Sequence, residues 1–140
     1  MSPGRRWVTR MKKIFWWLSF LAWLLAVLWL SLTPKPPQIE NGLLGWDKFQ
    51  HAAAYALLTL LAGRVFSLLP ARSRKYNPWR LALLAAALFG ISMELLQGAM
   101  GLGRTPDVMD FVADCVGACT VLAVARLWLS RHPREKDHMT

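Results

Sequence analysis

Charged residues are scarce in this sequence, and acidic ones are the scarcest. Only 18% of the 140 residues are charged, with 8 acidic against 17 basic side chains, while 55% are hydrophobic. A soluble domain of this length could not remove so much apolar surface from water. The apolar residues also fall into long blocks, as in helices that cross a membrane. The composition therefore excludes an ordinary soluble domain and predicts an integral membrane protein.

The two cysteines, Cys115 and Cys119, are too few and too close for a disulfide framework or a zinc site of their own. The formal charge of +9 does not indicate nucleic-acid binding either. A nucleic-acid domain would present a basic face on a polar helix. Here the basic residues gather at the ends of apolar blocks, which is typical of a signal for membrane topology.

Four apolar blocks are each near the length that crosses a hydrocarbon core. The first contains no charged residue and ends at a proline-rich stretch without a small-x-small cleavage site, so we expect a retained helix, not a signal peptide. The sequence predicts an all-α, polytopic membrane protein with four transmembrane helices. The blocks cover residues 14–32, 52–69, 81–100 and 111–129.

Basic residues also predict the orientation of these helices. They are concentrated before the first block, between the second and third, and after the fourth. Because such residues accumulate on the cytoplasmic side, both termini are expected in the cytoplasm. The predicted organisation is a basic cytoplasmic tail over 1–13, one four-helix domain over 14–130 and a second cytoplasmic tail over 131–140.

This topology brings most acidic residues to the outer membrane face. Asp47, His51 and Tyr55 recur at intervals of four, which puts them on one face of the second helix. Comparable spacing groups polar residues at the end of the third helix and the start of the fourth. We predict one polar pocket, with Lys48 and Arg104 as balancing cations. The residues predicted to line it are Asp47, Lys48, His51, Tyr55, Glu94, Gln97, Arg104, Asp110 and Asp114.

A structural network also explains some of these residues. Asp107 is well placed to cap the fourth helix, and Asp47 to cap the second. Hydrogen bonds between membrane helices contribute only about 0.6 kcal/mol each, whereas one central charge costs about 2.5–3.5 kcal/mol. Glu94 lies inside a helix that continues past it, so capping of its own helix does not account for it. A functional pocket and a structural network both stay open.

Two strings, WDKFQHAAAYALLTLLAG and MELLQGAMGLGRTPDVMDFVADCVGA, resemble the VanZ-like family of small bacterial membrane proteins. That family has D-K-x-x-H-x-x-x-Y on its second helix, followed later by E-x-x-Q, a Gly-Arg turn and D-x-x-x-N-x-x-G. Asp114 stands where the family commonly has Asn, and this extra carboxylate must be neutral, paired or metal-bound. The matching residues are Asp47, Lys48, His51, Tyr55, Glu94, Gln97, Gly103, Arg104, Asp110 and Gly117.

The resemblance implies a multi-pass protein of the bacterial inner membrane that acts in the cell envelope. The family is named after a protein associated with low-level teicoplanin resistance. The expected function is to bind or handle an envelope lipid or precursor, or to modulate glycopeptide susceptibility. The main alternative is an enzyme on a lipid-linked substrate, with His51 as general base and Glu94 as general acid. A small transporter ranks last, because small multidrug exporters carry their glutamate in the first helix, which here has no ionisable residue.

We predict no cofactor, and the bilayer is the expected partner beside an envelope ligand. Metal ligands with a defined spacing are missing from the sequence, so no metal is assigned. A carboxylate cluster with one histidine still leaves a divalent cation, Mg²⁺ or Zn²⁺, as an open alternative. The identity of the ligand and the oligomeric state do not follow from the sequence.

Overall fold

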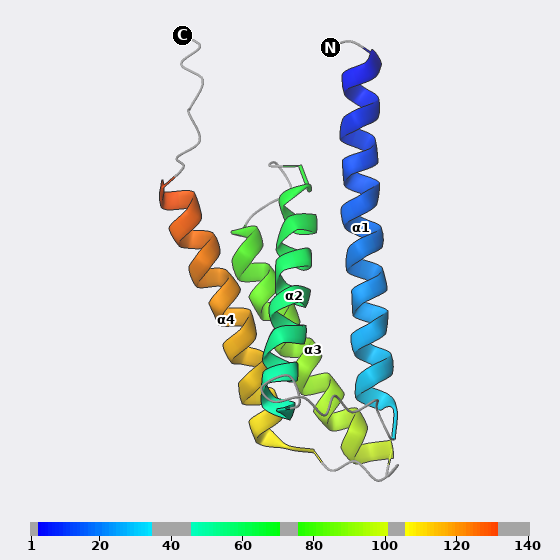
Figure 1. Cartoon of the computed structure of the whole chain (residues 1–140), viewed down its shortest axis with the longest axis vertical. Helices are drawn as coiled ribbons and strands as arrows, with labels where there is room; N and C mark the ends of the chain where they lie inside the picture. The colour runs from blue at the N-terminus through cyan, green and yellow to red at the C-terminus, as the bar shows by residue number, and fades with distance from the viewer. Residues whose placement is uncertain (1–2, 35–45, 71–75, 101–105, 132–140) are drawn as a thin grey trace.

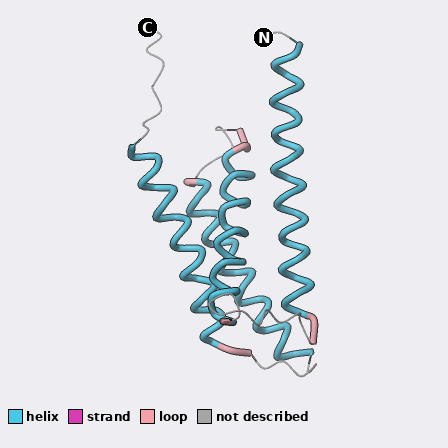
Figure 2. The backbone as a smooth tube through the Cα atoms, viewed as in Figure 1, coloured by secondary structure: helices cyan, strands magenta, loops and turns pink. Residues whose placement is uncertain are grey.

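The computed structural model describes residues 3–34, 46–70, 76–100 and 106–131, with side chains from Trp7 onward. These residues form four α-helices and no strand (Figure 2), so the all-α prediction is confirmed. Successive helices run in opposite directions (Figure 1). One end of the bundle therefore holds the start of α1, the end of α2, the start of α3 and the end of α4. The helices are α1 (Pro3–Leu32), α2 (Asp47–Ser67), α3 (Pro78–Met100) and α4 (Val108–Arg131).

Three of the described helices are long and apolar enough to cross a membrane. These segments are Trp7–Leu32, Pro78–Met100 and Val108–Arg131, and they make the chain a multi-pass membrane protein. The remaining helix, α2, contains charged residues in both its first and its last turn. It also contacts each of the other three helices, and this central position shelters its polar face.

The helix ends differ in part from those expected. Asn77 caps α3 by accepting a hydrogen bond from the Trp79 N–H at 2.9 Å, and Pro78 takes the first helical position, where its missing N–H does no harm. The predicted cap of α2 by Asp47 is wrong. Trp46 is the N-cap residue without a side-chain hydrogen bond, and Asp47 lies in the first turn. There its negative charge still interacts favourably with the helix dipole.

Small residues bring the helices close together. A Cβ atom on Gly117 of α4 would lie 1.9 Å from the carbonyl oxygen of Ala52 on α2, and one on Gly63 of α2 would lie 2.3 Å from Cε3 of Trp79 on α3. Small residues at such crossings let two membrane helices approach closely. The close approach of α2 and α4 brings the polar faces of these two helices together.

The first helix is held at one side of the bundle (Figure 1), where it packs against α2 and α3. The Trp23 Nε1–H donates a hydrogen bond to the Ala54 carbonyl at 3.0 Å. Near the other end of α2, the Arg64 guanidinium lies 5.2 Å from the centre of the Trp16 ring, a cation–π arrangement. Most other large side chains of α1 are exposed, as expected for a helix that faces lipid.

Candidate functional site

Charge is separated between the two ends of the bundle. With the exception of Lys48, the described basic side chains lie toward the end that holds the start of α1 and the end of α4. We call this the basic end. The described acidic side chains lie toward the opposite end, the acidic end. The basic group is Arg10, Lys12, Lys13, Arg64, Arg80, Arg126 and Arg131, and the acidic group is Asp47, Glu94, Asp107, Asp110 and Asp114.

Lys48, at the start of α2, lies among three aspartates. Its Nζ donates hydrogen bonds to Oδ2 of Asp107 at 2.5 Å and to Oδ1 of Asp110. Oδ2 of Asp47 lies 3.6 Å from the same nitrogen. The Asp110 side chain is only 13% exposed, so its contact with Lys48 is partly shielded from water and gains strength from the lower local dielectric. Lys48 thus ties the first turns of α2 and α4 together.

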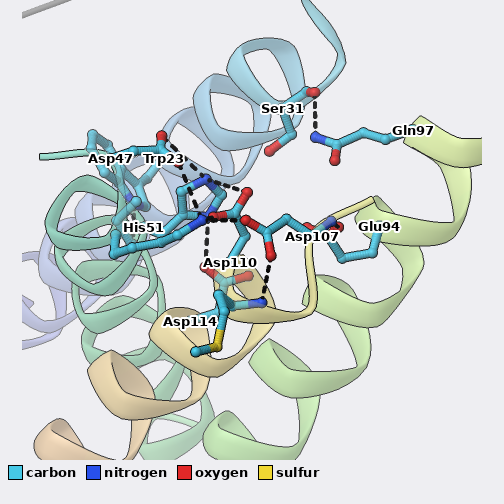
Figure 3. A network of polar contacts seen from close by, with 12 residues as sticks. Trp23, Ser31, Asp47, His51, Glu94, Gln97, Asp107, Asp110 and Asp114 are labelled. Atoms are coloured by element: carbon cyan, nitrogen blue, oxygen red, sulfur yellow. Dashed lines mark hydrogen bonds and ion pairs between the residues drawn. The ribbon is translucent and has the colours of Figure 1, made fainter. Parts of the chain in front are cut away.

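His51, one turn further along α2, faces aspartates with both ring nitrogens (Figure 3). Nδ1 lies 3.0 Å from Oδ1 of Asp114, within hydrogen-bond distance. Nε2 lies 3.6 Å from Oδ2 of Asp110 and 3.9 Å from Oδ1 of Asp47. The structure thus brings Asp47 and His51 onto one face of α2, as their spacing predicts, and turns that face toward α4.

Asp114 is the most deeply buried of these acidic residues. It is 2% exposed, and the neighbouring Tyr55 is 3% exposed. A Cβ atom on Gly90 of α3 would lie 3.1 Å from Oδ2 of Asp114 and 3.3 Å from Cε1 of Tyr55, so α3 closes the site against both side chains. The resembling family commonly has Asn at this position, and the carboxylate that this chain has there is paired with His51.

Two carboxylates complete the first turn of α4. Oδ1 of Asp107 accepts a hydrogen bond from the Met109 N–H at 2.8 Å, which confirms the predicted cap. Oε2 of Glu94, on α3, accepts one from the Asp107 N–H at 2.8 Å. The bond from Lys48, followed by that from the Met109 N–H, holds the pKa of the Asp107 carboxyl below its ordinary value of 3.8. Glu94 and Asp107 therefore have a structural task at the start of α4.

One predicted site residue, Gln97, contacts α1. The Gln97 Nε2 donates a hydrogen bond to the Ser31 carbonyl at 2.7 Å (Figure 3). This bond joins α3 to the last turn of α1, where helix carbonyls lack partners within their own helix. Gln97 is thus directed toward α1. Arg104, the second predicted cation, lies outside the described residues, as does Gly103.

We define the polar cluster as Asp47, Lys48, His51, Asp110 and Asp114. Asp107 borders it through its bond to Lys48. Its spacing of three from Asp110 predicts that both lie on one helix face, although Asp107 is not among the residues predicted to line the pocket. Within the cluster, three atoms that could bind a metal lie within 4.8 Å of one another, one each from Asp47, His51 and Asp110. The arrangement can hold a cation, and His51 can accept or release a proton.

The three apolar spans define a multi-pass membrane protein, and its polar cluster lies at one end of the helix bundle. The sequence matches the VanZ/LLP1 family over residues 5–129, which is most of the chain, and the protein belongs to this VanZ-like family. Neither a curated protein nor a solved structure matches the chain.

Proposed function

We propose that the protein spans the bacterial inner membrane four times, with both termini in the cytoplasm and the acidic end at the outer face. The distribution of charge supports this orientation, because basic residues accumulate on the cytoplasmic side. The fourth span is α2, whose 21 residues are long enough to cross the hydrocarbon core. Its charged residues lie in its first and last turns, where they reach the membrane interface.

We propose further that the polar cluster binds an envelope lipid or a lipid-linked precursor at the outer face, and that expression of the protein thereby modulates glycopeptide susceptibility. One observation carries this proposal. A buried carboxylate, Asp114, and a histidine, His51, meet two further aspartates at the end of membrane-spanning helices. Ser, Thr or Asn would join the helices at a lower desolvation cost than this group of ionisable residues.

The exposure of the cluster suits a ligand that arrives from the membrane surface. The Asp47 side chain is 61% exposed, whereas that of Asp114 is 3% exposed. The cluster thus leads from an open rim to a buried carboxylate. Its excess of carboxylates favours groups that donate hydrogen bonds or carry positive charge, such as the hydroxyl, amide and amino groups of envelope precursors.

Lys48 supports this choice of ligand. It is one of the two predicted balancing cations, and its ammonium group is already bonded to Asp107 and Asp110. A free phosphate approaching this lysine would meet those carboxylates as well. Recognition through hydroxyl and amino groups therefore fits the described residues better than recognition of a bare anion.

An enzyme acting on a lipid-linked substrate is the second candidate, and the contact between His51 and Asp114 favours it. A carboxylate bonded to one ring nitrogen orients an imidazole and supports its action as a general base through the other nitrogen. Glu94 fits the catalytic role less well than the sequence suggested, because its carboxylate accepts the Asp107 N–H. On this alternative His51 is the acid–base residue.

Lipid identification in gently purified protein tests the proposal. The wild type is expected to retain one class of envelope lipid that His51→Ala and Asp110→Asn lose, and a Leu95→Ala control at an exposed position should keep it. Teicoplanin susceptibility of cells that express the same proteins should follow lipid retention. Identical lipid content in all variants, with lower thermal stability of the two cluster variants, would show a structural network instead.

A further inference from the structure

The geometry points to a divalent metal site formed by Asp47, His51 and Asp110, with Asp114 as the residue that orients His51. We infer that the ion is a first-row transition metal of the Zn²⁺ type. One imidazole nitrogen and two carboxylate oxygens are ligands that this class of ion accepts, with a further coordination position open.

The two nitrogens of His51 have different surroundings. Nδ1 is 3.0 Å from a carboxylate oxygen of Asp114, so in the neutral imidazole Nδ1 carries the hydrogen and Nε2 presents its lone pair. Nε2 faces Oδ2 of Asp110 and Oδ1 of Asp47 at 3.6 and 3.9 Å. These distances are too long for direct hydrogen bonds. They are close to the roughly 3.4 Å between two ligand atoms of a tetrahedral ion with bonds of about 2.1 Å.

Lys48 organises the two carboxylates for this task. It bonds Oδ1 of Asp110 and lies 3.6 Å from Oδ2 of Asp47. In each aspartate the other oxygen is the one that faces Nε2 of His51. Both free oxygens are therefore directed to the same point by a cation on their far side, and little reorganisation is required when an ion binds.

Asp114 supplies a separate argument, from outside the three ligands. Asp114 is 2% exposed, and its carboxylate bonds the ring nitrogen that faces away from the proposed ion. A carboxylate that holds the distal nitrogen of a histidine is the usual outer partner of a metal ligand, because it fixes the tautomer and raises the basicity of the imidazole. An Asn, which the resembling family commonly has here, would bond the ring but would lack the negative charge.

The charge balance favours the same conclusion. Among the described residues of the acidic end, Lys48 is the one Lys or Arg, and it pairs with Asp47, Asp107 and Asp110. Asp114 and Glu94 add two further carboxyl groups at this end. A divalent ion between Asp47 and Asp110 offsets part of this excess. The competing arrangement is a proton on Nε2, which would make His51 itself the cation. The experiment below distinguishes a bound metal ion from a protonated His51. The ion requires no bound lipid, so its test does not depend on the proposed function.

Metal titration of the full chain in detergent tests the inference, in a Cys115→Ala, Cys119→Ala background that removes adventitious thiol ligands. After treatment with chelator, the protein should bind one Zn²⁺ per chain. His51→Ala and Asp110→Asn should weaken binding at least tenfold, and Asp114→Asn about tenfold, as for outer partners of other metal ligands. Asp47→Asn, at a largely exposed side chain, gives an independent measure if the buried variants fail to fold. Co²⁺ should give visible absorption typical of four-coordinate geometry.

Asp107→Asn is the matched control, because Asp107 bonds Lys48 but contributes no ligand atom to the three. Its Zn²⁺ affinity should remain within about twofold of that of the parent. Failure of the parent to bind Zn²⁺ would overturn the inference and leave the protonated histidine. Equal losses in Asp107→Asn and Asp110→Asn would also overturn it, because they would show attraction of ions to an acidic surface without a defined site.

Discussion

The carboxylate of Glu94 on α3 accepts a hydrogen bond from the backbone N–H of Asp107, the residue before α4, at 2.8 Å. The first N–H groups of a helix have no partner within that helix. Asp107 satisfies one of them with its own side chain, that of Met109, and Glu94 satisfies the N–H of Asp107 itself. A glutamate from one membrane helix thus completes the start of the next.

This relationship predicts that Glu94→Gln and Glu94→Ala behave differently. Gln keeps an oxygen that can accept the Asp107 N–H, whereas Ala leaves this partly buried donor without a protein acceptor, at a cost of about 1 kcal/mol. We expect a lower melting temperature for Glu94→Ala and a near wild-type one for Glu94→Gln in thermal unfolding of detergent-purified protein. Leu95→Ala, at an exposed position on the same turn, is the control. Equal melting temperatures for Glu94→Gln and Glu94→Ala would contradict the assigned bond.

Much of the fold could be predicted from hydrophobic blocks, because a helix in lipid satisfies its own backbone groups and needs little else. The start of α1 was placed too late, since the helix continues through the basic stretch to Pro3. The second apolar block begins at residue 52, whereas α2 begins at Asp47, in agreement with the helix face predicted through Asp47 and His51. Apolar composition predicts which residues of a helix contact lipid. It does not predict where the helix ends, because a helix can continue beyond the lipid-facing residues.

The site could be predicted only in part, for a different reason. Spacing along one helix is a local property, so the shared face of Asp47 and His51 followed from the sequence. The direction of Gln97 toward Ser31 depends on how α3 is rotated against α1. That rotation follows from how α3 packs against its neighbours, for example at Gly90 against Tyr55 and Asp114. The residue pattern of a single helix contains no information about it.

Gly117→Ala tests the close approach of α2 and α4. The added methyl group would lie 1.9 Å from the Ala52 carbonyl oxygen, which is backbone and cannot rotate away. Separating the helices is expected to cost about 1–3 kcal/mol, the usual range for overpacking, and to reduce the amount of protein in membranes. Val116→Leu adds volume at the neighbouring exposed position and should accumulate normally. If both variants accumulate like the wild type, α2 and α4 are further apart than described.

The bond between Lys48 and Asp107 predicts a pH dependence of stability. Because the pKa of Asp107 is lowered in the folded protein, its ionised form stabilises the fold above the ordinary value of 3.8. This contribution is lost as the pH falls through the folded pKa. Asp107→Asn keeps a capping side chain but no charge. The wild type should therefore melt at a higher temperature than Asp107→Asn at pH 6, and the difference should shrink below pH 4. A constant difference across this range would assign the effect to capping alone.

Cysteine labelling tests the orientation on which the proposed function depends. In a background without Cys115 and Cys119, single cysteines at Trp46, at the start of α2, and at Arg131, at the end of α4, report on opposite ends of the bundle. A membrane-impermeant maleimide applied to intact spheroplasts should label Trp46→Cys, and Arg131→Cys only after permeabilisation. Both positions are exposed, so access within the protein does not limit the reaction. The reverse pattern would place the polar cluster at the cytoplasmic face. Recognition of an outer-leaflet lipid would then be excluded, while the metal site, which depends only on side-chain geometry, would stand.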